Sequence, residues 1–175
     1  MPSPGLTFPV PLPRAGQQRA WWRLPASFTG LACAILSACQ QHDGPVLVIA
    51  ADNAAAHQLE SDLRLLAGPE GGLEILGFPD WETLPYDRFS PHPDIVNRRL
   101  STLATLPGLQ RGAVVVPVAT LMQRLPPRSH VIGSRFDVRT GQRLDLDAEK
   151  RRLESAGYRN VPQVHDPGDF AVRGG

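Results

Sequence analysis

The fold of this chain is decided by two short apolar runs, VLVIA at residues 46–50 and AVVVPV at residues 113–118. Both runs are rich in β-branched side chains, and Gly44 and Pro45 bound the first one. Continuous apolar runs of this length are typical of parallel-sheet strands that are buried on both faces. We therefore predict a parallel sheet and expect helices to cover both faces of residues 46–50.

Helical patterns lie before, between and after these runs. Apolar side chains at helical spacing predict a first helix from Phe28 to Cys39, and Asp52 is expected to cap a second helix. Asp94 is predicted to start a third helix that runs to about residue 106, and a short helix is expected around residues 120–125.

A further strand is predicted over residues 73–78, followed by a long loop over residues 79–93 that Trp81 and Tyr86 anchor. Strands that alternate with helices of this length indicate right-handed βαβ units. The predicted fold class is therefore α/β with an open parallel sheet.

Proline placement and a change of pattern divide the chain into three predicted parts. Residues 1–25 form a proline-rich arm, which is expected to lie on the surface, and residues 26–127 form the α/β domain. From residue 128 onward the pattern changes. Residues 131–137 alternate apolar and polar side chains, residues 145–156 predict a charged helix, and residues 170–172 predict a strand. Residues 128–175 are therefore expected to be the start of a small α+β domain.

Charge and composition exclude several classes of protein. A formal net charge of +1 and a pI of about 7.9 give no overall field that would attract nucleic acid or an acidic membrane. No apolar run approaches the roughly 18 residues of a membrane span, so we expect a cytoplasmic protein without a membrane partner. Cys33 and Cys39 fall on different faces of one helix, which predicts two free, buried thiols rather than a disulfide.

The place where a phosphate-binding loop would lie lacks the residues that such a loop needs. Residues 25–32 read PASFTGLA, with one glycine and no lysine, and Lys150 is the only lysine in the chain. In a phosphate loop a lysine reaches the β and γ phosphates of the nucleotide. We therefore predict that this chain does not hydrolyse ATP and has no catalytic residue, cofactor site or metal site.

Other polar residues are assigned structural roles. Asp52 is interpreted as a helix cap rather than a magnesium ligand, and the five histidines lack ligand spacing. The pairs Arg98-Arg99 and Arg151-Arg152 are interpreted as solvated helix faces. Three loop carboxylates are interpreted as exposed rather than catalytic: Asp80, Glu82 and Asp87.

Arg173 is the candidate binding residue. It follows the apolar residues 170–172 and precedes Gly174-Gly175, so it is placed at the edge of a predicted sheet. A guanidinium there can make bidentate contacts with a partner's carboxylates.

Several stretches together resemble the amino-terminal region of bacterial transcription-repair coupling factor. The most specific is DWETLPYD at residues 80–87, and the resemblance covers nearly the whole chain after the proline-rich arm. The other stretches are FSPH at 89–92, RLSTL at 99–103, residues 111–124 with VVPV and TLMQR, GQRL at 141–144 and SAGYR at 155–159.

This resemblance implies a domain similar to the first domains of the excinuclease protein UvrB, which has a helicase fold, with a degenerate P-loop NTPase site. It also implies that residues 128–175 begin the small domain that binds the excinuclease protein UvrA, with Arg173 in the interface. The family's RNA polymerase-binding domain and its DNA translocase, which uses ATP and magnesium, have no counterpart here. The chain is thus expected to be a fragment or a truncated gene product, and further interface residues would lie beyond Gly175.

Three hypotheses for the function remain open at this point. The first is an interaction module that recruits UvrA to stalled RNA polymerase in transcription-coupled nucleotide excision repair. The second is a helicase domain of the UvrB type with an unconventional ATP site. The third is a stand-alone α/β binding protein without a role in repair.

Overall fold

The computed structural model describes residues 10–14, 16–23, 26–68, 72–84, 86–133, 138, 140–166 and 168–173. The chain forms two compact units, Met1–Arg124 and Leu125–Gly175, which we describe one at a time. Among the described residues, no helix combines the length and the hydropathy that crossing a membrane requires.

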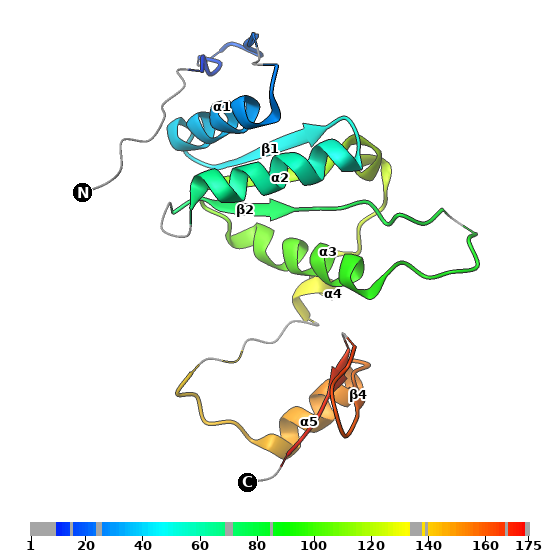
Figure 1. Cartoon of the computed structure of the whole chain (residues 1–175). Coiled ribbons are helices and arrows are strands. Elements are labelled where there is room, and N and C mark those ends of the chain that lie inside the picture. The colour runs from blue at the N-terminus through cyan, green and yellow to red at the C-terminus, as the bar shows by residue number, and fades with distance from the viewer. Residues whose placement is uncertain are drawn as a thin grey trace. The chain divides into compact units, whose positions relative to one another are not determined.

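The first unit is built on a three-stranded parallel sheet (Figure 1). The strands are β1 (Pro45–Ala50), β2 (Glu74–Gly77) and β3 (Gly112–Pro117), in the order β1-β3-β2. In β3 all six residues are buried, as a continuous apolar run in a central strand predicts. The predicted α/β class with a parallel sheet is confirmed.

Helices α1 (Phe28–Gln41) and α2 (Asn53–Ala67) cover one face of this sheet. Their apolar stripes pack against alternate residues of the strands, and Cys39, Leu63 and Val115 are almost completely buried there. Helix α3 (Pro93–Thr105) covers the other face, where Leu103 packs beside Val114, Val116 and other apolar residues. The first unit therefore has three layers, with a larger core beneath α1 and α2.

The prediction that β1 is buried on both faces is wrong. Val46 and Val48 pack against the α1–α2 core, but Leu47 is 56% exposed and Ile49 is 54% exposed. Both residues lie opposite β3 residues of the face that α3 covers. Because β1 is an edge strand and α3 packs beside β2, a single helix does not reach across to β1.

Side-chain caps begin the three long helices. Ser27 accepts a hydrogen bond from Gly30 N at 3.2 Å, and Asp52 accepts one from Ala55 N at 2.7 Å, which confirms the predicted cap. Helix α3 begins one residue before the predicted Asp94, with His92 as its cap. Two short 3₁₀ helices follow later in the unit, η1 (Leu106–Gly108) and η2 (Val118–Met122), and η2 replaces the helix expected over 120–125.

Both cysteines are free, as predicted, but only Cys39 is buried, since Cys33 is partly exposed. From the proline-rich arm, Val10 and Trp22 pack against Ala34 and Ala38 of α1, and the Trp22 indole donates to the Pro11 carbonyl at 2.8 Å. The described part of the arm is thus held by α1.

The second unit contains helices α4 (Arg128–Gly133) and α5 (Leu146–Ser155) and a pair of short parallel strands, β4 (Arg159–Asn160) and β5 (Asp169–Phe170). Asp145 caps α5 by accepting from the backbone of residues 147 and 148. The alternating pattern that begins at Val131 does not give a strand there, because Val131 lies in α4; residues 134–137 fall outside the described residues. The predicted strand over 170–172 ends at Phe170.

Candidate protein-interaction site

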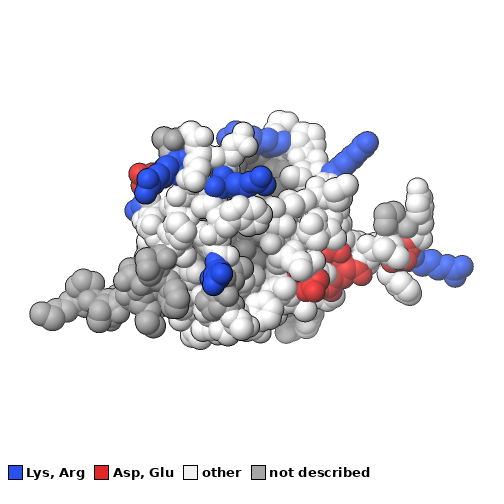
Figure 2. Space-filling model, turned by 90° about the horizontal axis from the view of Figure 1, so that it is seen from above, with Lys and Arg blue, Asp and Glu red and all other residues white. Residues whose placement is uncertain are grey.

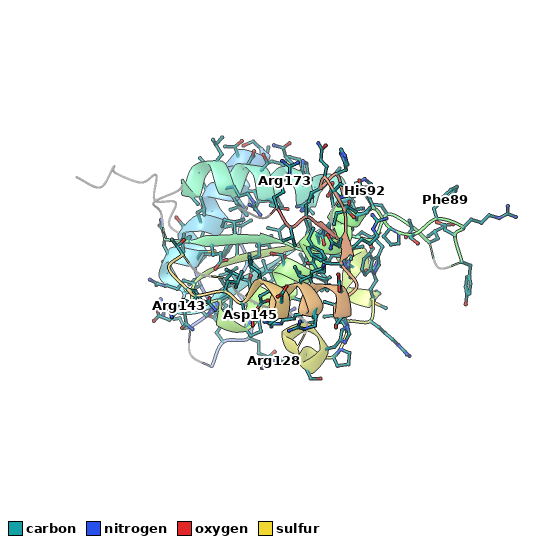
Figure 3. The ribbon with its side chains drawn as sticks, turned by 90° about the horizontal axis from the view of Figure 1, so that it is seen from below. Phe89, His92, Arg128, Arg143, Asp145 and Arg173 are labelled. Carbon is teal, nitrogen blue, oxygen red and sulfur yellow. The ribbon has the colours of Figure 1, made fainter. Side chains whose placement is uncertain are left out.

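Arg173 lies three residues beyond the end of β5 and is exposed (Figure 3). None of the residues that the structure describes forms an ion pair with its guanidinium. Val172 beside it is half exposed. An unpaired arginine next to an exposed apolar side chain is a combination that is enriched at protein interfaces.

The hydrogen bonds between β4 and β5 fix the position of the strand that precedes residues 171–173. Arg159 N donates to Gly168 O at 2.8 Å, and Val161 N donates to Phe170 O at 2.9 Å. The Arg159 guanidinium also lies 2.9 Å from a carboxylate oxygen of Asp169, whose side chain is 5% exposed. The strand before Arg173 is therefore held at both ends, by backbone bonds and by a charge pair.

Helix α5 packs beside β4 and carries three consecutive basic residues, Lys150, Arg151 and Arg152. Arg152 lies 3.8 Å from Glu149, and Arg151 is exposed. The predicted solvated face is confirmed for Arg151 and Arg152. The molecular face shown in Figure 2 carries Lys and Arg side chains on a largely uncharged surface, with smaller areas of Asp and Glu.

The prediction that Arg98 and Arg99 form a solvated pair is wrong for Arg99. This residue is 2% exposed, and its guanidinium lies over the rings of Phe78 and Trp81, at 4.2 and 4.0 Å from the ring centres. Burial lowers the pKa of Arg99, and the nearby carboxylate of Asp80 opposes that shift. Arg99 stays a cation because the usual pKa of arginine lies so far above neutrality.

The predictions for the carboxylates and aromatic residues of the loop are also right for some residues and wrong for others. Glu82 and Asp87 are exposed, as predicted, but Asp80 is half-buried and accepts hydrogen bonds from Thr120 and Gln123. Trp81 anchors the loop, as predicted, through Arg99, whereas Tyr86 is fully exposed and anchors nothing. The spacing of Trp81 and Arg99 in the sequence gives no signal of their contact, because the loop brings them together.

A buried carboxylate that the sequence analysis missed lies between α2 and α3. Glu60 is almost completely buried and accepts hydrogen bonds from Arg64 at 2.8 Å and from Arg98 at 2.9 and 3.0 Å. The spacing of Glu60 and Arg64, four residues apart on one helix, was a signal for part of this cluster. The cluster joins α2 to α3.

The described residues near the expected phosphate loop form a capped helix start. The Ser27 hydroxyl accepts a hydrogen bond from the Gly30 amide, and the Thr29 hydroxyl donates to Asp62 of α2 at 3.1 Å. Lys150 lies in the second unit. Among the described residues, no group of three or more histidine, cysteine or acidic side chains could hold a metal ion.

The chain is similar in sequence to several curated proteins. It is 46% identical over 170 residues to the transcription-repair-coupling factor of Escherichia coli K12, which covers 96% of this chain and 14% of that protein. It is 41% identical over 143 residues to the Haemophilus influenzae factor, covering 82% of this chain and 12% of that protein. The factor of Myxococcus xanthus is 35% identical over 165 residues, covering 92% and 14%. No family model matches the chain.

The fold defines a two-unit α/β protein whose first unit is built on a small parallel sheet. Over nearly its whole length this protein is a homologue of transcription-repair-coupling factors, so the predicted resemblance is confirmed. The chain spans about one seventh of the length of the relatives it matches.

Proposed function

We propose that this chain is an interaction module of a protein involved in transcription-coupled DNA repair. Its role would be to bind the excinuclease protein UvrA through the second unit. The observation that carries the proposal is the exposed Arg173, three residues beyond the end of the hydrogen-bonded strand β5, in a chain homologous to transcription-repair-coupling factors. In this proposal the first unit is a helicase-like scaffold with a degenerate nucleotide site, and the amino-terminal region of the factor is the part that the chain represents.

Two features support a scaffold without ATP hydrolysis. The only lysine, Lys150, belongs to the second unit, and the start of α1 is capped by the protein's own Ser27. The first turn of a helix binds phosphate through its free backbone N–H groups. The Ser27 cap uses one of these groups, so fewer remain to bind a phosphate. Calorimetric titration with magnesium and ATP tests this point, and saturable binding would contradict it.

The exposed arginine suits a partner with a carboxylate, because a guanidinium binds carboxylates with two parallel hydrogen bonds. It has no ion pair among the described residues, so a partner would not have to displace one. The hydrogen-bonded strand that ends three residues before Arg173 restricts where this segment starts, which reduces the entropy lost when the partner binds.

The test is a calorimetric titration of this chain with purified UvrA. Arg173→Ala should weaken binding by about 1 to 3 kcal/mol, the range for one charged interface contact. Arg173→Lys should recover only part of the loss, because an ammonium cannot form the two parallel bonds. Arg151→Ala, which removes another exposed arginine of the second unit, is the matched control.

Equal affinities for the native chain and for Arg173→Ala would remove Arg173 from the interface. Absence of any binding by the folded native chain would contradict the proposed partner itself. Far-ultraviolet circular dichroism of each variant establishes that the second unit is still folded.

A further inference from the structure

The loop between β2 and α3 leaves the body of the first unit and returns to it, with Phe89 near its far end (Figure 3). Trp81 holds the outgoing end against Arg99, and Asp80 next to it is held by Gln123. At the returning end, His92 caps α3 by accepting from Asp94 N at 3.3 Å. Contacts with the rest of the first unit therefore hold both ends of the loop in place.

Three large apolar side chains at this tip are exposed to solvent. Leu84 is 74% exposed, Phe89 is 82% exposed, and Tyr86 is fully exposed. Single exposed apolar residues are ordinary on protein surfaces, but three within six positions form a patch. The patch has the composition of an interface centre, where aromatic side chains supply most of the binding.

Two hydrogen bonds join Leu84 to Asp87 at the tip. Asp87 N donates to Leu84 O at 3.1 Å, and Leu84 N donates to a carboxylate oxygen of Asp87 at 2.7 Å. Within this turn Tyr86 has a φ of 79°, in the left-handed region that bulky residues rarely adopt. Backbone conformations of this kind are concentrated at binding and active sites, and the Tyr86 side chain is fully exposed to solvent.

An apolar hollow lies beside the tip. Its volume is about 400 Å³, enough for one or two large side chains, and it is open to solvent. Most of the side chains that line it are apolar: Trp81, Thr83, Leu84, Pro91, Val96 and Gln123. Leu84 belongs to both the hollow and the tip, so the two form one continuous surface.

Charge indicates what could cover this surface. Over residues 81–96 the exposed charged side chains are the carboxylates of Glu82, Asp87 and Asp94 and the guanidinium of Arg88. Arg124, which follows Gln123 in the sequence, is exposed as well, so carboxylates outnumber guanidinium groups by three to two. An excess of carboxylates repels the phosphates of nucleic acids and of anionic lipids, and attracts lysine and arginine. We propose that the tip and the hollow together are a docking site for an apolar segment of a partner protein, flanked by basic residues.

This site lies in the first unit and shares no residue with the Arg173 region. The variants that test the two proposals are therefore different, and either proposal can fail alone. The hydrogen bonds between Leu84 and Asp87 contribute to affinity, because they reduce the loop entropy that is lost on binding.

The experiment pans a phage-displayed library of random peptides against the immobilised chain. Enriched peptides should contain apolar residues flanked by lysine or arginine. A synthetic peptide with the enriched sequence is then titrated by fluorescence anisotropy, beside a second peptide in which glutamate replaces each basic residue. The charge-reversed peptide should bind at least about tenfold more weakly.

Tyr86→Ser and Phe89→Ser should each weaken binding of the selected peptide by about tenfold or more, because each removes an exposed aromatic contact. Glu82→Lys should weaken it as well. Leu65→Ser is the matched control, since Leu65 is 80% exposed but lies on α2, and it should leave the affinity unchanged.

Peptides that bind equally well to the Tyr86 and Phe89 variants would overturn the proposal, as would a library that yields no enriched peptide. Single-stranded oligothymidylate is titrated in parallel, and binding that depends on Tyr86 would assign the surface to nucleic acid instead. Self-association in analytical ultracentrifugation that both serine variants abolish would assign it to a second copy of the chain.

Discussion

The guanidinium of Arg99 lies 4.0 Å from the centre of the Trp81 ring, inside the first unit. The same guanidinium donates to the backbone carbonyl of Pro79 and lies 4.2 Å from the centre of the Phe78 ring. A single cation from α3 thus holds both the ring and the backbone of the segment that leaves β2. This contact fixes the direction in which the long loop departs.

Arg99→Ala is expected to destabilise the first unit by about 3 kcal/mol. The variant loses two cation–π contacts of about 1 kcal/mol or more each, and it leaves the Pro79 carbonyl without its charged donor. Urea unfolding followed by circular dichroism measures the change. Arg88→Ala, at an exposed position of the loop, should shift stability by less than about 0.5 kcal/mol. A loss below about 1 kcal/mol for Arg99→Ala would show that the stacking contributes little.

Gly77→Ala is expected to destabilise the protein by roughly 1 to 3 kcal/mol through its effect on Glu60. A Cβ atom at Gly77 would lie 2.0 Å from a carboxylate oxygen of Glu60, so the carboxylate would have to leave its hydrogen bonds with Arg64 and Arg98. In a Glu60→Ala background the same change should cost less than about 0.5 kcal/mol, because nothing remains to be displaced. Additive effects in this double-mutant cycle would rule out the clash.

Gly112→Ala is the control, because its cost is expected not to depend on Glu60. Its Cβ atom would lie 2.0 Å from the backbone oxygen of Glu74, and Gly112 has a φ of 146°. Backbone atoms of a paired strand cannot move aside as a side chain can. The cost should therefore exceed that of Gly77→Ala and should be the same with and without Glu60.

The thiol of Cys39 should make stability depend on pH in the alkaline range. Burial raises the pKa of Cys39 to about 11 from a usual value near 9, and a hydrogen bond with the backbone opposes part of that shift. The folded protein therefore holds this proton more tightly than the unfolded chain does. The stability that the neutral thiol contributes is complete below pH 9 and is lost as the pH rises through about 11.

The measurement is the difference in unfolding free energy between the native chain and Cys39→Ala, followed from pH 7 to pH 11. The difference should fall by about 1.4 kcal/mol per pH unit between pH 9 and about pH 11. A pH-independent difference for Cys39→Ala would contradict the raised pKa.

Ile49→Thr should change stability by less than about 1 kcal/mol, whereas Val48→Thr should cost more than about 1 kcal/mol. Ile49 is half exposed on the open side of β1, but Val48 packs against the core beneath α1 and α2. Thermal unfolding of the two single variants measures both costs. Equal losses would show that the outer side of β1 is covered in solution.

Much of the local structure could be predicted from the sequence. The apolar runs gave the positions of β1 and β3, and the cap at Asp52 was correct because the bond to Ala55 spans only three residues. Tyr86 and Arg99 were misplaced. The rings that cover Arg99 belong to Phe78 and Trp81, which are distant in the sequence, so its spacing does not reveal its burial. Tyr86 is fully exposed, and its residue type alone does not reveal that.

By itself the sequence determined that the chain builds a parallel α/β sheet and that Lys150 is its only lysine. Only the tertiary structure decided that Arg99 is buried, that Tyr86 is exposed and that one side of β1 stays open. The physical reason is that periodicity reports which side chains of an element share a face. Whether that face is buried depends on which helices the connections between strands place over it. Among the described helices, α3 packs on the sheet face that contains Leu47 and Ile49.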